Sequence, residues 1–512
     1  MKITSKIAHR GRWKTCAASA AVATSMLALA ACGGTGSSDP AAATSVLKIV
    51  NEADIGTFDP ALNGNTEGHR LDYLTYGYLT KFPDGTPELA QALKPTDGNK
   101  SWTVTLRPGL KFSDGSPLTS KDVVASFERL LKPPTNTGEV VENIASVTAP
   151  DPNTVLFKLR QPDVAFAKSL AINSAAIFPA ANVSSGSFFK TPPISAGPYV
   201  IDKGDLASGS YTLTQNPNYW GKAASVKEID FTTVNDGGTR LAQLESGQVN
   251  YAKSIPASQL KGLPSNLHIN KVAFPGSMIQ LLLNDGPGSS SVTTDPKIRQ
   301  AINLAVDREQ IAKVALSGYM APLYGIPWAD PSKQADAFSR DTTKAKQLLQ
   351  GTACANGCTI KLLNIADFNW QLPPVSQVVQ QNLKDIGINV ELVNQPSATI
   401  GKVTPSDDWD GMVGDTGSAL MTDSSVARLS LTSFQWWTEP ANDLPMFPEL
   451  ASLEAKLASA PAKKAAAVRG QIDTEFAKEL PWIPLTNLYF LDVSSVPASV
   501  VESPIGWRLN LK

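Results

Sequence analysis

The chain has few of the residues that usually carry covalent and acid–base catalysis. Its 512 residues include four cysteines and three histidines. It contains neither the Gly-x-Ser-x-Gly turn of serine hydrolases nor the Gly-x-x-x-x-Gly-Lys-Ser/Thr loop that cradles phosphates. We therefore expect no enzymatic activity and no cofactor.

Long hydrophobic runs and an excess of basic residues are also lacking. The apolar run over residues 17–31 is rich in alanine and shorter than the ~20 residues that a spanning helix needs. Residues 1–31 hold five of the 45 Lys and Arg residues and none of the 46 Asp and Glu residues, so the rest of the chain has a net charge of −6. This charge argues against a nucleic-acid partner, which requires a basic patch. The remaining length, about 480 residues, predicts two or three lobes rather than one core.

The N-terminal residues have the order of a secretory signal. Five basic residues precede the apolar run, and small residues lead to Cys32. The sequence Leu29-Ala30-Ala31-Cys32 resembles the bacterial lipobox, in which the cysteine receives a lipid and becomes the mature N-terminus. This resemblance implies a lipoprotein signal peptide over residues 1–31, a flexible tether over 32–44, and a lipid anchor on the extracytoplasmic face of the cell membrane. A plain signal peptide is the alternative.

Two further cysteines, Cys354 and Cys358, are separated by a short turn sequence. Asn356-Gly357 favours a turn that brings the sulfur atoms together, and outside the cytoplasm such a pair can form a disulfide. Metal binding is the alternative, but it needs further ligands, and few histidines are present. We expect a disulfide and no metal.

Periodic patterns predict a mixture of strands and helices. The predicted strands are residues 47–50, 102–106, 155–159 and 388–392, and the predicted helices are 121–131, 375–386 and 450–480. Ser120 is a candidate N-cap for the first of these helices, and Gly387 a C-terminal stop for the second. Asp295-Pro296 precedes a further amphipathic helix.

The most specific motif covers residues 102–131, WTVTLRPGLKFSDGSPLTSKDVVASFERLL. It resembles the signature of the family 5 extracellular solute-binding proteins, the peptide, dipeptide and nickel receptors of ABC importers. Further matches follow in the order of the family over nearly the whole chain. They lie at residues 57–61, 84–90, 196–199, 216–220, 244–247, 299–308, 386–388 and 481–485.

The resemblance implies an α/β fold, a two-lobed periplasmic-binding-protein-like clamshell. The first lobe is expected over residues 45–272, with an extra subdomain at about 87–195. The second lobe is expected over 273–484, and residues 485–512 return to the first. The chain would cross between the lobes near Ala273-Phe274 and Pro484-Leu485, where hinges permit closure on a ligand.

The resemblance also implies the function of a receptor. A monomer would capture short peptides and deliver them to an ABC permease in the membrane. An oligosaccharide receptor and a metal-chelate (nickel-type) receptor of the same fold are alternatives, as is an extracytoplasmic hydrolase.

Candidate ligand contacts follow from the resemblance alone. In peptide-binding members, an aspartate after an apolar strand pairs with the α-ammonium of the peptide. Asp415 stands at this position, Asp423 is the next candidate, and a structural loop aspartate is the alternative. Nearby aromatic side chains are expected either to wall the pocket or to pack in a core. The ligand-binding residues implied are Asp415, Trp409, Phe434, Trp436, Trp437, Asp54, Thr57 and Asn487.

Overall fold

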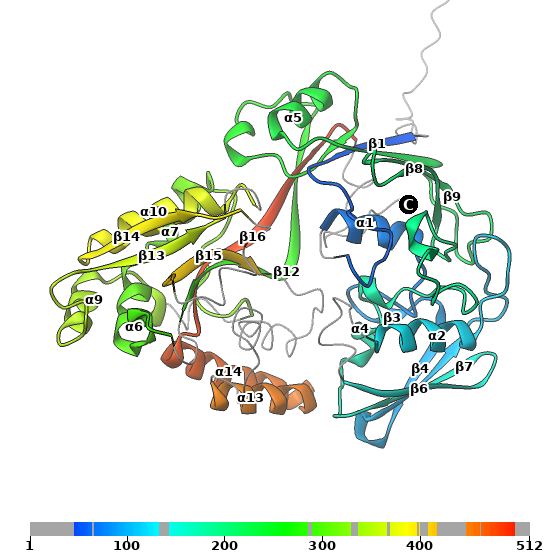
Figure 1. Ribbon diagram of the computed structural model, residues 1–512, viewed down its shortest axis with the longest axis horizontal. Helices are drawn as coiled ribbons and strands as arrows, with labels where there is room; N and C mark the ends of the chain where they lie inside the picture. The colour runs from blue at the N-terminus through cyan, green and yellow to red at the C-terminus, as the bar shows by residue number, and fades with distance from the viewer. Residues whose placement is uncertain are drawn as a thin grey trace, which may run out of the picture. The chain divides into compact units, whose positions relative to one another are not determined.

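The computed structural model describes residues 46–63, 66–132, 143–284, 289–328, 336–365, 369–396, 399, 408–416, 447–460 and 462–496. The signal sequence, Cys32, the tether, Asp423, Phe434, Trp436 and Trp437 lie outside these residues. In the described part, the largest sheet is mixed and has ten strands in the order β14-β13-β15-β12-β16-β11-β1-β10-β9-β8 (Figure 1).

Three parallel strands near one end of this sheet form what we call the first set. They are β1 (Val46–Asn51), β10 (Glu228–Thr233) and β11 (Tyr251–Ala252). Two antiparallel strands, β9 (Ser210–Gln215) and β8 (Tyr199–Asp205), continue the sheet to its edge. Because side chains alternate along β1, Leu47 and Ile49 pack in one core with residues of α1 (Thr66–Thr75). Val50 packs with α5 (Gly237–Glu245) in another.

Three other parallel strands form the second set, with helices on both faces. They are β13 (Cys358–Asn364), β14 (Ile388–Asn394) and β15 (Gly411–Thr416). On one face, Leu362 and Val413 pack in the core that includes α6 (Pro296–Ala305), α9 (Thr342–Leu349) and α10 (Leu372–Lys384). On the other face, Leu363 and Met412 pack against α13 (Pro448–Ser459) and α14 (Ala462–Glu479).

Two long antiparallel strands connect the two sets, and we call them the crossing strands. They are β12 (His268–Leu283) and β16 (Trp482–Ser494), which run side by side through the middle of the sheet in Figure 1. At one end β16 pairs with β11, and at the other end β12 pairs with β15. The register between them shifts after Ala273, which faces Tyr489, and resumes at Met278, which faces Asn487.

A separate four-stranded antiparallel sheet carries the signature motif. Its order is β4 (Ala90–Thr96), β5 (Ser101–Leu106), β7 (Thr154–Leu159) and β6 (Ile144–Asp151). The strands predicted at 102–106 and 155–159 are confirmed, because Val104 and Phe157 alternate with more exposed neighbours and pack under α2 (Ser120–Leu130). This sheet has its own core and lies within the range expected for an extra subdomain.

Short elements complete the described part of the chain. They are β2 (Thr80–Lys81), β3 (Thr86–Pro87), α4 (Phe166–Ser169), α7 (Arg308–Gln310), the π-helix Ile311–Ala315 and the 3-10 turns Asp97–Asn99, Asn173–Ala175, Phe188–Lys190, Ala257–Gln259 and Val292–Thr294. None of the described helices combines the length and the hydropathy that crossing a membrane requires. A disulfide joins Cys354 and Cys358 beside the start of β13.

The predicted N-cap of α2 is wrong by one residue. Thr119 occupies the N-cap, and its backbone N–H donates to the Asp122 carboxylate at 2.7 Å, which completes a capping box. Ser120 is the first helical residue, and its hydroxyl donates to the carbonyl of Asp151 instead. Asp295 was placed correctly: its side chain accepts from the backbone N–H of Lys297 at the start of α6.

The helical region predicted over residues 450–480 is confirmed, and it consists of two helices, α13 and α14, of which α13 ends before Pro461. Proline has no backbone N–H to donate within a helix, and its ring disfavours the helical conformation of the residue before it. Ala460 accordingly has an extended backbone, with ψ of 130°.

Candidate ligand-binding site

The carboxyl ends of the two strand sets point toward one another. β11 is antiparallel to β16, β16 to β12, and β12 to β15. Three successive reversals mean that the second set runs opposite to the first. In open α/β sheets, ligands bind beyond the carboxyl ends of strands. The region between the two sets, spanned by the crossing strands, is therefore the candidate site.

The register of β16 gives the separation between the two sets. Ala252, at the end of β11, pairs with Val493, whereas Thr416, at the end of β15, pairs with Met278 and through it with Asn487. Six residues of extended chain span about 20 Å at ~3.3 Å per residue. This is the separation of the two strand ends along the crossing strands.

On the side of the second set, the central group is the carboxylate of Asp415. Its Oδ2 accepts a hydrogen bond from Asn369 Nδ2 at 2.8 Å. Burial raises the pKa of Asp415, and the hydrogen bond from Asn369 only partly opposes this rise. The site thus presents a desolvated carboxylate whose described side-chain partner is a neutral amide.

Asn487 lies at the same end of the crossing. It pairs with Met278 across the crossing strands, and its backbone N–H donates to the carbonyl of Ala321 at 3.0 Å. Its position at the level of Asp415, which pairs with Ile279, keeps it a candidate ligand contact.

The expectation that Trp409 walls the pocket is wrong. Trp409 precedes β15 at its amino end, whereas Asp415 lies at the carboxyl end of the same strand. Its side chain is 3% exposed and packs in the core with Leu363 and Met412. Asn284 also donates to its carbonyl at 2.9 Å, so Trp409 has a structural role.

On the side of the first set, two predicted residues follow the carboxyl end of β1. Asp54 accepts hydrogen bonds from the Tyr211 hydroxyl at 2.6 Å and from the backbone N–H of Ile55 at 2.7 Å. Thr57 accepts from the backbone N–H of Asp59 at 3.0 Å. These contacts order the loop after β1, and the binding roles of Asp54 and Thr57 stay predictions.

A group of charged side chains beside this loop, most of them buried, was not predicted from the sequence. We call it the ionic cluster, and it consists of Glu52, Glu67, Arg70, Arg240, Lys253 and Asp492. The signal available in the sequence was the presence of Lys253 and Asp492 within otherwise apolar stretches that read as strands.

Asp492 is the part of the ionic cluster that belongs to a crossing strand. Arg70 Nη2 lies 3.2 Å from its Oδ2, and the Tyr251 hydroxyl donates to the same oxygen. The backbone N–H of Ser254 donates to Oδ1 at 2.9 Å. Asp492 is fully buried, so these contacts fix β16 to α1 and β11 at the edge of the site.

Two further carboxylates complete the ionic cluster. Lys253 forms a buried ion pair with Glu67 of α1. Glu52, directly after β1, accepts from the Ser254 hydroxyl at 2.9 Å and lies 3.9 Å from Arg240. Burial and the neighbouring carboxylate of Glu67 raise the pKa of Glu52 to about 7, although Lys253 and Arg240 favour its ionised form.

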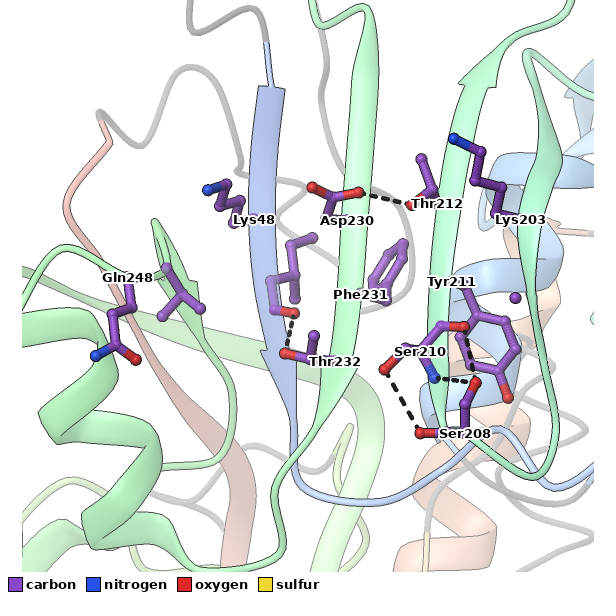
Figure 2. Close-up of a pocket in the computed structure, with 13 residues that line it drawn as sticks. Lys48, Lys203, Ser208, Ser210, Tyr211, Thr212, Asp230, Phe231, Thr232 and Gln248 are labelled. Atoms are coloured by element: carbon purple, nitrogen blue, oxygen red, sulfur yellow. Dashed lines mark hydrogen bonds between the residues drawn. The ribbon is translucent and has the colours of Figure 1, made fainter.

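A separate hollow of about 510 Å³ lies on the face of the first set opposite α1. Figure 2 shows Lys48, Asp230 and Thr212 side by side on β1, β10 and β9, with Asp230 accepting from Thr212 at 2.9 Å. The hollow opens on the middle of these strands rather than at their carboxyl ends, and it includes neither Asp54 nor Asp415. The region between the strand sets stays the candidate ligand-binding site.

Comparison with known proteins identifies the family. Residues 85–438 match the family model described as bacterial extracellular solute-binding proteins, family 5 Middle. The chain belongs to this family. It is the substrate-binding protein of an ABC importer, and it is not an enzyme.

Three relatives illustrate the range of this family. The probable D,D-dipeptide-binding periplasmic protein DdpA of Escherichia coli (strain K12) is 28% identical over 388 residues, which are 72% of this chain and 74% of the relative. NikA from Brucella suis, solved in complex with Fe(III)-EDTA, has a TM-score of 0.77 and 20% identity, covering 91% of this chain and 98% of its own.

The third is the ABC transporter-associated periplasmic binding protein DppA from Helicobacter pylori, solved in complex with the peptide STSA. It has a TM-score of 0.74 and 21% identity, covering 91% of this chain and 96% of its own. These structural matches confirm the α/β periplasmic-binding-protein fold expected from the sequence.

Removal of the buried charge on Asp492 should destabilise this solute-binding protein strongly. In Asp492→Asn, Arg70 keeps its charge but loses its carboxylate partner in a buried environment. Such losses cost ~3–5 kcal/mol, so the free energy of unfolding should fall by about that amount in urea titrations. The control is Asp408→Asn, which breaks an exposed ion pair with Lys361 and should change stability little. Equal effects of the two substitutions would contradict the assigned role of Asp492.

The ionic cluster should also give stability a dependence on pH. The pKa of Glu52 is about 7 in the folded protein and ~4.3 in an unfolded chain. The folded protein therefore favours the protonated side chain of Glu52. The contribution of Glu52 to stability is fully present below pH ~4.3 and is lost as the pH rises through 7. The thermal midpoint of Glu52→Gln relative to wild type should therefore rise between pH 4.5 and 7 and level off above it. Glu391→Gln, which removes an exposed carboxylate on β14, is the control. A difference that stays constant across this range would refute the assignment.

Proposed function

We propose that this family 5 protein is a lipid-anchored receptor that captures short peptides and delivers them to an ABC permease. The observation that carries the proposal is the half-buried carboxylate of Asp415 at the carboxyl edge of the second set, with a neutral amide as its described side-chain partner. A peptide α-ammonium would supply the opposite charge. A charge pair in such a partly dry site is stronger than one on an open surface.

The names of the relatives support peptides but also admit metal chelates. The Escherichia coli relative is named for D,D-dipeptides, and the Helicobacter pylori structure contains a peptide. The Brucella suis structure instead contains Fe(III)-EDTA, whose chelator is a polycarboxylate. The carboxylate of Asp415 would repel carboxylates of this kind. The described residues contain no group of three or more metal-ligating side chains.

An oligosaccharide receptor remains the second candidate. Sugar rings commonly stack on aromatic side chains, and Phe434, Trp436 and Trp437 follow Asp415 in the sequence. Trp409 is buried, so one of the four aromatic side chains near Asp415 no longer supports an oligosaccharide ligand. Peptides are therefore the better supported ligand class.

We further propose that the two strand sets belong to lobes that close on the peptide. The lobe ranges are those expected from the sequence: residues 45–272 with the subdomain, 273–484, and the return over 485–512. Ala273 pairs with Tyr489, and the register resumes at Asn487, so the pairing supports a second crossing at 487–489, a few residues after Pro484-Leu485. The protein would act as a monomer, with both lobes contributed by one chain.

Asp415→Ala should weaken the binding of a free-amine peptide such as trialanine. Leaving one member of a buried charge pair alone costs ~2–5 kcal/mol, which corresponds to a loss of affinity of tens-fold or more at about 1.4 kcal/mol per decade. N-acetylation of trialanine should reduce binding to wild type similarly and binding to the variant much less. Calorimetry on the four combinations measures this coupling. Equal affinity of wild type and Asp415→Ala for trialanine would show that Asp415 is a structural loop residue.

Lipidation should depend on Cys32. In the native host, Cys32→Ala should abolish both lipid attachment and processing at residue 31, because the cysteine is the lipid acceptor in the lipobox that Leu29-Ala30-Ala31-Cys32 resembles. Membrane fractionation, combined with mass spectrometry of the N-terminus, checks this outcome. A correctly cleaved variant that still fractionates with membranes would rule out the lipid anchor.

A further inference from the structure

A chain of hydrogen bonds connects Asp415 to a crossing strand. Asn369 Nδ2 donates to Asp415 Oδ2 at 2.8 Å, and Asn369 Oδ1 accepts from the backbone N–H of Gln371 at 3.0 Å. Gln371 Nε2 then donates to the carbonyl of Tyr489 at 2.9 Å. Tyr489 lies on β16 and faces Ala273, where the register of the crossing strands begins to shift.

The chemistry of the partners fixes the orientation of both amides. An amide oxygen cannot donate, so the nitrogen of Gln371 must face the Tyr489 carbonyl. In Asn369, the oxygen must face the N–H of Gln371, which leaves the nitrogen for the carboxylate of Asp415. Gln371 thus donates in both directions, through its backbone N–H toward Asn369 and through its side chain toward Tyr489.

A contribution to the stability of the fold does not explain why a glutamine occupies position 371. Gln371 is fully buried, and its Oε1 has no hydrogen-bond partner among the residues that the structure describes. An unpaired buried acceptor lowers stability. The residue occupies the N-cap position of α10, but its side chain makes no capping hydrogen bond. Its described side-chain hydrogen bond is the one to Tyr489.

We propose that Asn369 and Gln371 are positioning residues for Asp415, which hold its carboxylate in one orientation and tie it to β16 where the chain crosses. This inference rests on the proposed function, because it assumes that Asp415 receives the ammonium of a peptide. Its consequence is that the ligand-binding carboxylate and the crossing strand keep a fixed relation as the peptide binds.

The surroundings of Asp415 make its protonation a usable readout. β12, β13 and α10 are the described elements that pack most closely on β15, and no charged side chain from them contributes to the raised pKa of Asp415. Burial raises this pKa, and the hydrogen bond from Asn369 lowers it. Loss of the Asn369 donor should therefore raise the pKa of Asp415 further. A protonated Asp415 cannot pair with an ammonium, so peptide affinity should fall at a higher pH in such a variant.

The experiment measures affinity by calorimetry between pH 4.5 and 7.5. The probe is whichever of dialanine, trialanine and tetra-alanine binds wild type best. Asn369→Ala removes both contacts of the side chain, whereas Asn369→Ser keeps an oxygen that can accept from the N–H of Gln371 but is too short to reach Asp415. Gln371→Met replaces the buried amide with an apolar side chain of similar size. Thermal unfolding of each variant reports on stability.

Both Asn369 variants should lose affinity at a higher pH than wild type does. Gln371→Met should bind several-fold more weakly at every pH, with a thermal midpoint equal to or above that of wild type. If both Asn369 variants show the wild-type dependence of affinity on pH, the proposal is overturned. It is also overturned if Asn369→Ser alone behaves like wild type, because the hydrogen bond to the N–H of Gln371 would then be the one that matters. Unchanged affinity in Gln371→Met would overturn the tie to β16.

Asp415→Asn separates this failure from failure of the proposed function. If Asp415→Asn binds as tightly as wild type, or if wild type binds none of the alanine peptides, the peptide-receptor proposal is wrong. If Asp415→Asn loses affinity while the Asn369 variants keep the wild-type profile, only the positioning roles are wrong.

Discussion

The antiparallel pairing of β12 with β16 is the constraint on which the site depends. A sheet made only of parallel strands would place all carboxyl ends at one edge. The two crossing strands, each paired with a different set, reverse the direction of the second set relative to the first. Both carboxyl edges, which are the ligand-binding edges of open α/β sheets, then face the same region. The long pairing also makes β12 and β16 the connection through which any change in the separation of the two sets must pass.

Electrostatics differ on the two sides of this region. On the side of the first set, the ionic cluster contains three acidic and three basic side chains, and ion pairs such as Arg70–Asp492 and Lys253–Glu67 neutralise one another. Buried pairs of this kind contribute specificity of position more than stability, because desolvation offsets much of their attraction. Here they hold α1 and β11 against β16. On the side of the second set, Asp415 is half-buried beside an amide rather than a cation among the described side chains, so a positively charged ligand group would offset its partial desolvation.

Much of the fold could be predicted from local sequence, because local physics determines it. Alternation located β5 and β7, Asp295 and Pro296 located the start of α6, and the strand after Gly387 is β14. One error was local as well, since Thr119 rather than Ser120 caps α2.

The site was less predictable, because its contacts join distant segments. Arg70 and Asp492 are 422 residues apart in the chain, and Gln371 and Tyr489 are 118 apart, so no periodic pattern links them. The place of Trp409 could not be predicted, because a tryptophan side chain suits a pocket wall as well as a core. The direction of β15 shows that Trp409 lies at the amino end of this strand, in a core, and not at the carboxyl end with Asp415. Asp415 was found through the resemblance to family 5 proteins rather than through its surroundings.

The most direct test of a peptide receptor is the identity of what the protein carries. Native mass spectrometry of the protein isolated from its own cells, followed by release and sequencing of bound molecules, measures this without a choice of probe. The account predicts short peptides with a free α-amino group. Recovery of an oligosaccharide or a metal chelate in their place would contradict it.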